Sequence, residues 1–186
     1  MLFSLCTMVL AAQNNFRKFD STMKLGRAGF RVVCSNKSEE KNMLSITPVG
    51  FSNQARDVSF DIKGRVLKAE VDDLNNDNFP DLVIYVYPKG DKMKGTVLGV
   101  ASINNESFMP ISFPDITDDI KNRVGYVGYD QFTLMEGTLM RRFPVYTADS
   151  VGAQPTGMVR QIQYRTVPGE RQNLQFKVVR SYEFKQ

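Results

Sequence analysis

The chain has 186 residues, of which 42% are hydrophobic and 24% are charged, a composition that excludes a wholly disordered chain. Basic residues are spread along the sequence, so it lacks the basic stripe or motif expected of a nucleic-acid-binding protein. The absence of histidine excludes Ser-His-Asp and Cys-His catalysis and histidine zinc sites. The net charge of +4 favours an acidic partner surface. This length suits one domain, which we place at residues 13–186.

Residues 1–12, MLFSLCTMVLAA, are uncharged and mostly apolar, and the chain becomes polar directly afterwards. This pattern predicts the apolar part and cleavage end of a signal peptide that lacks the usual basic start, with a buried N-terminal strand as the alternative. The segment is too short to span a membrane. We therefore expect a periplasmic or secreted protein. After cleavage Cys34 is the only cysteine, which excludes an internal disulfide.

From residue 16 onward, short runs of alternating apolar and polar residues predict β-strands. In one of them Cys34 lies on the apolar face and is expected in the core. The runs 58–62 and 65–71, separated by Lys-Gly, predict a hairpin. The run 82–87, LVIYVY, is apolar or aromatic throughout, which predicts a central strand covered on both faces.

Only residues 115–123 predict a helix. They follow a proline, and Ile116, Ile120 and Val124 recur at helical spacing. Acidic residues lie towards the start of this segment and basic residues at its end, as the helix dipole favours. Gly125 would end the helix, which therefore leads directly into the string GYVGY.

The string GYVGY, residues 125–129, combines backbone freedom from glycine with the rigid contact surface of tyrosine. Such a composition suits a shaped loop at a protein interface, because exposed tyrosines are enriched at interface centres. The alternative is a turn whose tyrosines only cover the core.

Residues 132–146 alternate again but change face at Glu136-Gly137, which indicates a turn or bulge. Arg141 and Arg142 then point to opposite faces. Either one of them is buried and paired, with Glu136 as a candidate partner, or both lie on an edge strand. Two final alternating runs complete an all-β pattern. The sequence thus predicts an antiparallel β-sandwich of about 8–10 strands with one short helix.

Three strings resemble the periplasmic inhibitors of I-type lysozyme in their order and spacing. They are GYVGYDQF (residues 125–132), EGTLMRRFPVY (136–146) and RQIQYRTVPGE (160–170). With a further match at 73–87, the resemblance covers roughly the C-terminal two thirds of the chain, whereas residues 13–60 agree only loosely. The resemblance implies a β-sandwich that blocks the substrate cleft of a lysozyme with a loop.

In these inhibitors the loop carries a serine and, three residues later, a tyrosine. Tyr126 matches the tyrosine, whereas Arg123 stands at the serine position. A guanidinium can bond the carboxylates of the cleft, so Arg123 either preserves the contact or is only a favourable charge at a helix end. We expect lysozyme as the partner, bound by Tyr126, Arg123, Gly125, Gly128 and Tyr129.

The turn DLNNDNFPD, residues 73–81, has the spacing of a short calcium loop. Side-chain oxygens of Asp73, Asn75, Asp77 and Asp81 and the carbonyl of Phe79 occupy alternate positions. Calcium takes six to eight hard oxygen ligands, which a tight turn can bring together. The alternative is a metal-free turn in which Asp and Asn cap backbone amides.

Two functions therefore remain open. The first is an exported lysozyme inhibitor that acts by occlusion, needs no cofactor and is not an enzyme. The second is a calcium-stabilised binding module of the cell envelope that recognises glycan or protein. A glycosidase would need two carboxylates facing each other across a cleft, and the aspartates here crowd into one turn. A homodimer is left open.

Overall fold

Two β-sheets make up the described part of the chain, residues 17–52, 55–90, 93–147, 152–170 and 173–185 of a computed structural model. The predicted all-β class is confirmed. The predicted signal peptide, residues 1–12, lies outside the described residues. In the described ranges, no helix has the length and apolar character needed to cross a membrane.

The first sheet is antiparallel, with four strands in the order β1-β2-β3-β4. Their bounds are Phe19–Leu25 for β1, Ala28–Cys34 for β2, Asn42–Val49 for β3 and Val58–Ile62 for β4. Cys34 is fully buried on the apolar face of β2, as the alternation predicts.

The second sheet has eight strands in the order β5-β6-β7-β8-β12-β11-β10-β9. The strands are β5 (Arg65–Asp72), β6 (Asp81–Tyr87), β7 (Thr96–Ile103), β8 (Ser107–Ser112), β9 (Gln131–Met135), β10 (Thr138–Tyr146), β11 (Pro155–Pro168) and β12 (Leu174–Lys185). All neighbours pair antiparallel except β8 and β12, which are parallel over a short stretch. The twelve described strands exceed the predicted number of about 8–10.

The predicted hairpin between residues 58–62 and 65–71 is wrong. Strand β4 pairs with β3, whereas β5 pairs with β6 in the other sheet. The Lys-Gly pair is the crossing point between the sheets rather than a hairpin turn. Gly64 has a φ of +110°, and a Cβ there would lie 2.4 Å from the carbonyl oxygen of Tyr87. Only glycine fits this crossing.

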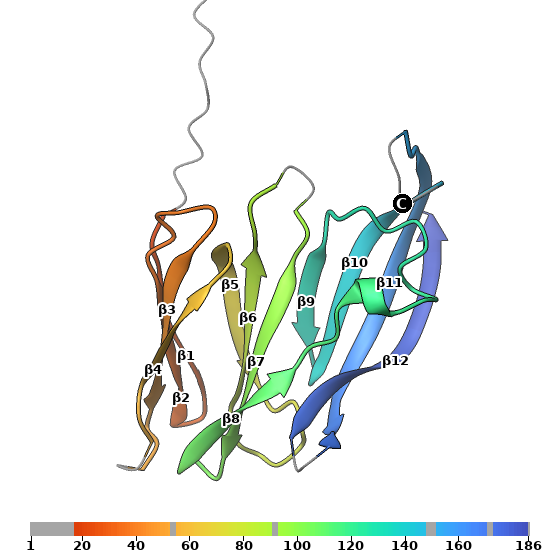
Figure 1. The fold of residues 1–186 in the computed structure, drawn as a ribbon. Helices are drawn as coiled ribbons and strands as arrows, with labels where there is room; N and C mark the ends of the chain where they lie inside the picture. Colours follow the sequence, from red (N-terminus) through yellow and green to blue (C-terminus); the bar gives the residue numbers. More distant parts are fainter. Residues whose placement is uncertain (1–16, 53–54, 91–92, 148–151, 171–172, 186) are drawn as a thin grey trace, which may run out of the picture.

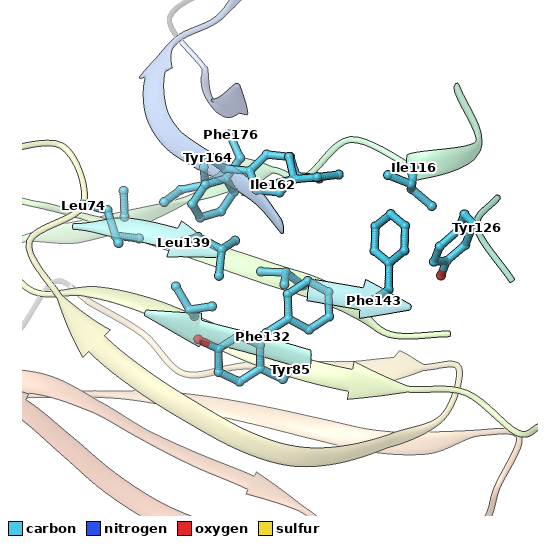
Figure 2. Packing of buried hydrophobic residues seen from close by; sticks show 14 residues of the cluster. Leu74, Tyr85, Ile116, Tyr126, Phe132, Leu139, Phe143, Ile162, Tyr164 and Phe176 are labelled. Carbon is cyan, nitrogen blue, oxygen red and sulfur yellow. The ribbon is translucent and has the colours of Figure 1, made fainter. Parts of the chain in front are cut away.

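The eight-stranded sheet curves around one core and supports a second (Figure 1). One apolar cluster lies between the two sheets and includes Leu82, Ile84 and Val86 of β6. The other cluster, which we call the inner core, lies inside the curved sheet and includes Val83 and Tyr85 of the same strand. Figure 2 shows Tyr85 within it. The prediction that residues 82–87 form a strand covered on both faces is confirmed.

The first sheet lies against β5–β7, while β9–β12 lie at the opposite side of the molecule (Figure 1). In β9–β12 the side chains Leu139, Phe143, Ile162 and Tyr164 point into the inner core. We call the opposite side of these four strands the outer face of β9–β12. The two halves of this sheet therefore differ in what covers them.

The predicted helix at residues 115–123 is reduced to a single 3-10 turn, η1 (Ile116–Asp118). Asp115 caps this turn by accepting the N–H of Thr117 at 2.8 Å. Asp119 then accepts the backbone N–H groups of Lys121 and Asn122 at 3.1 and 3.0 Å. Aspartate side chains thus bond the amides locally instead of leaving them to a continuing helix.

Candidate protein-binding site

Residues 119–130 lead from η1 to β9 and are hydrogen-bonded to the strands beneath them. The N–H of Tyr146 in β10 donates to the carbonyl of Gly125 at 2.9 Å. Arg160 in β11 donates to the carbonyls of Asn122 and Val124 at 2.7 and 2.6 Å. Three carbonyls of the segment are therefore held by the sheet, which fixes the course of this loop.

Arg160 is held in turn by β12. Its guanidinium bonds the carboxylate of Glu183, and only 9% of the residue is exposed. The hydroxyl of Ser181 donates to the side-chain carbonyl of Asn122 at 2.6 Å, and Asn122 is itself buried. Charge-assisted bonds of this kind are stronger than neutral ones, so the loop is anchored through polar side chains of β11 and β12.

A buried ion pair closes the end of the loop. Arg141 donates to both carboxylate oxygens of Asp130 at 2.7 and 2.9 Å, and these side chains are 2% and 0% exposed. Tyr126 donates to Asp130 at 2.6 Å and accepts from Arg141 at 2.9 Å. The N–H of Gly95 adds a bond to Asp130 at 2.8 Å. The charges are thus satisfied by several partners, as buried charges require.

The electrostatics of this cluster favour the ion pair and a neutral phenol. The hydrogen bonds and charge of Asp130 raise the pKa of Arg141, although burial opposes that rise. Burial raises the pKa of Tyr126, so its hydroxyl stays protonated and can donate to Asp130. The candidate partner Glu136 does not pair with Arg141. Asp130 pairs with it instead. The register of β9 and β10 sets Arg141 opposite Phe132, near the start of β9 where Asp130 lies, whereas Glu136 lies beyond the other end of β9.

Tyr126 differs from the exposed anchor that the resemblance implies. It is 7% exposed, and its ring packs edge-on against Phe143 at 4.9 Å (Figure 2). The guanidinium of Arg141 lies 5.0 Å from the centre of the same ring. Its ring and hydroxyl are both engaged inside the protein. In this structure Tyr126 positions the loop, and its insertion into a partner would require these contacts to break.

The two predicted glycines have left-handed backbone angles, φ +73° at Gly125 and +120° at Gly128. A Cβ on Gly125 would lie 2.5 Å from the carbonyl oxygen of Tyr146, so the close approach to β10 requires glycine there. Tyr129 also has a positive φ of +63° and is 37% exposed. Its ring stacks on that of Tyr146, at a centroid distance of 6.3 Å.

Exposed apolar side chains stand on the outer side of this anchored loop. Ile120 is 76% exposed and Val124 is 62% exposed. Between them lies Arg123, also exposed, which donates to the carbonyl of Thr117 at 3.0 Å. The spacing of these two residues predicted only a helix, and in the structure both side chains are exposed outside it. Contact of Arg123, Gly125, Gly128 and Tyr129 with a partner stays a prediction.

The predicted calcium loop is a turn stabilised by its own side chains. Asp73 accepts the N–H groups of Asp77 and Asn78 at 3.0 and 2.9 Å. Asn75 accepts from the N–H of Asp77, and Asp77 accepts from that of Phe79 at 2.8 Å. These are the contacts expected of a turn without metal, in which Asp and Asn side chains cap backbone amides.

Asp81, the last residue of this loop, is fully buried and accepts the N–H groups of Leu74 and Ser102, each at 3.0 Å. Burial raises the pKa of Asp81 to about 7, with a contribution from the charges of Asp77 and Asp73. In the described residues, no three acidic or cysteine side chains form a metal-ligand group. Calcium binding by Asp73, Asn75, Asp77, Phe79 and Asp81 therefore stays a prediction.

Comparison with known proteins gives little further information. No family model and no curated protein matches the chain. One solved structure, described as "Structure of a Xanthomonas Type IV Secretion System related protein", aligns with 94% of this chain and 97% of its own, at a TM-score of 0.34 and 12% identity. At this TM-score we infer nothing about function from the similarity.

Proposed function

We propose that this chain is an exported inhibitor of lysozyme that acts by occlusion, with residues 119–130 as the surface that enters the substrate cleft. The observation that carries the proposal is a loop fixed to three strands that displays Ile120, Arg123 and Val124 to the outside. The resemblance of residues 125–132, 136–146 and 160–170 to lysozyme inhibitors supports it. A fixed loop loses little conformational entropy on binding, which favours affinity.

The exposed side chains suit the chemistry of such a cleft. Glycoside hydrolysis uses two carboxylates on either side of the scissile bond. Arg123 would approach these carboxylates with its guanidinium, while Ile120 and Val124 would displace water from the neighbouring sugar subsites. Tyr126 would act through the loop, by holding it against Asp130 and Arg141. No bond is made or broken, so the protein needs no catalytic group.

A mixing experiment tests this function. The full chain is incubated with I-type, c-type and g-type lysozyme, and the rate of cell-wall lysis is measured. We expect one class to be inhibited and the variant Val124→Asp to weaken that inhibition by at least about tenfold, because it buries a charge in the interface. Leu67→Asp, at a residue of β5 that is 40% exposed, is the matched control.

Tyr126→Phe separates a positioning role from direct insertion. This variant keeps the ring and the ion pair but removes the hydroxyl, so we expect a smaller loss of inhibition than with Val124→Asp. A greater loss of inhibition with Tyr126→Phe than with Val124→Asp, at unchanged stability, would mean that Tyr126 contacts the lysozyme directly. Full activity of all three lysozymes with a large excess of the protein would refute the proposal.

A further inference from the structure

The outer face of β9–β12 carries an unusual balance of charge. The four strands, which the structure describes in full, contain seven basic residues and one acidic residue, Glu183. Glu183 bonds Arg160, whose guanidinium reaches the loop carbonyls on the inner side. Arg142, Arg165 and Arg180 lie on the outer face with Lys177, and all four are exposed. No carboxylate in these strands balances them there.

Aromatic rings accompany these cations. Tyr182 and Phe184 on β12 are 37% and 36% exposed. The guanidinium of Arg180 lies 4.9 Å from the centre of the Tyr182 ring, and that of Arg142 lies 6.0 Å from the centre of Phe184. Cation–π contacts hold such arginines extended over the rings, so their charges are presented from a partly ordered surface.

A cavity of about 330 Å³ lies at one end of this face. It is lined by Tyr129, Gln131, Arg142, Pro144 and Tyr146, among others. Tyr129 lines it from a left-handed backbone conformation, with φ at +63°, that non-glycine residues seldom adopt. Strained residues of this kind are often found where a side chain must be held for function.

We propose that the outer face of β9–β12 binds an acidic protein, whose carboxylates meet the four exposed cations and one of whose apolar side chains enters the cavity beside Tyr129 and Tyr146. The composition supports a protein partner, since interface centres are enriched in tyrosine, phenylalanine and arginine and depleted in aspartate and glutamate. A symmetric contact between the outer faces of two copies is disfavoured, because it would place the same four cations against each other.

Other anionic polymers fit the geometry less well. Single-stranded nucleic acid binds along a basic groove that follows its backbone, with bases stacked on successive rings. Here the cations lie on a sheet face, on three different strands, and the cavity stands at one end. This surface shares Tyr129 with the proposed inhibitory loop 119–130, but its four cations lie outside that loop, and the proposal does not depend on lysozyme inhibition.

Binding of defined polymers tests the proposal. The probes are a random copolymer of glutamate and tyrosine, polyglutamate, polygalacturonate and oligo(dT), and affinity is measured by fluorescence anisotropy or calorimetry at several salt concentrations. We expect the glutamate-tyrosine copolymer to bind most tightly, with an affinity that falls as salt rises.

Two variants and one control locate the binding. Arg142→Glu with Arg180→Glu should weaken binding of the copolymer by at least about tenfold, and Tyr129→Asn should remove its advantage over polyglutamate. Asparagine is chosen because it tolerates a positive φ. Lys24→Glu with Arg27→Glu makes the same change of net charge at exposed positions of the first sheet and its turn, and should have little effect. Circular dichroism and thermal melting confirm that each variant is folded.

Several outcomes would overturn the proposal. Tighter binding of polygalacturonate or oligo(dT) would assign the face to another class of polymer. An equal loss in the Lys24→Glu, Arg27→Glu control would reduce the binding to general charge attraction, and no binding of the copolymer at low salt would also contradict it. Lysozyme inhibition should be unchanged in the Arg142→Glu, Arg180→Glu variant, which separates this surface from the proposed inhibitory loop.

Discussion

Strands β5–β7 and β9–β12 share one sheet and one inner core, yet the faces turned away from that core differ. In β6 these positions are Leu82, Ile84 and Val86, and the first sheet covers them. In β10 and β12 they include Arg142 and Arg180, which are exposed. Alternation along a strand separates two faces. Whether the face turned away from the inner core is apolar or charged depends on whether another sheet or solvent covers it.

The largest loss of stability should come from a substitution on the inner side of β10. Replacing Arg141 by methionine leaves the buried carboxylate of Asp130 without its partner, and we expect a loss of about 3–5 kcal/mol in the free energy of unfolding. Arg142→Met, one residue away on the outer face, should cost about 1 kcal/mol or less. Urea denaturation measures both. Similar losses would mean that the two faces of this half are equally important for stability.

A second test compares apolar side chains in the two halves. Ile84 is fully buried between the sheets, so Ile84→Ala should cost about 2–5 kcal/mol through lost burial and a residual cavity. Val179 on β12 is 52% exposed, and Val179→Ala should change stability by no more than about 0.5 kcal/mol. A large loss at Val179 would show that β12 is covered in solution.

Alkaline titration should separate the tyrosines of the inner core from the rest. Burial raises the pKa of Tyr87 and Tyr164 to about 12, and it also raises the pKa of Tyr85. Above pH 10 the unfolded chain loses phenol protons that the folded chain retains, so stability falls as pH rises, by at most about 1.4 kcal/mol per pH unit for each phenol.

The measurement is absorbance of tyrosinate combined with circular dichroism. We expect part of the absorbance change to coincide with unfolding, and Tyr164→Phe to reduce that part. Ionisation of all tyrosines before any loss of structure would contradict the burial of the inner core.

The smallest effect on stability is expected where the β5–β7 half of the sheet contacts the β9–β12 half. The carboxylate of Asp72, at the end of β5, accepts the N–H of Gly137 in the turn between β9 and β10 at 2.8 Å. Calcium in the adjacent loop 73–81 would stabilise this junction. At ten times its dissociation constant it would add about 1.4 kcal/mol, seen as a higher melting temperature with calcium than with chelator. An unchanged melting temperature would remove the predicted calcium site.

Local sequence patterns predicted correctly the features that depend on a single strand or turn. The uninterrupted apolar run of β6 predicted burial on both faces, and the change of face at Glu136-Gly137 predicted the turn between β9 and β10. The opposite directions of Arg141 and Arg142 followed from period two alone. These features depend on residues that are close in sequence.

Features that depend on pairing between distant segments could not be predicted. The partner of Arg141 is fixed by the register of β9 and β10, and the burial of Tyr126 by that same ion pair. The run 58–71 has the pattern of a hairpin, and only the packing of two sheets decides that its strands separate. Asp119 ended the predicted helix through side-chain bonds that helical spacing does not reveal.

The crossing at Gly64 separates the chain into two parts that meet mainly through side-chain packing. All four strands of the first sheet come from the segment Phe19 to Ile62, and among the described strands a single connection, from β4 to β5, joins this sheet to the other. We expect this segment to unfold as one cooperative unit, and the same connection would allow domain swapping of the sheet between two molecules. Amide hydrogen exchange would then show two kinetic groups that divide at this glycine, and a domain-swapped pair would provide a route to a homodimer.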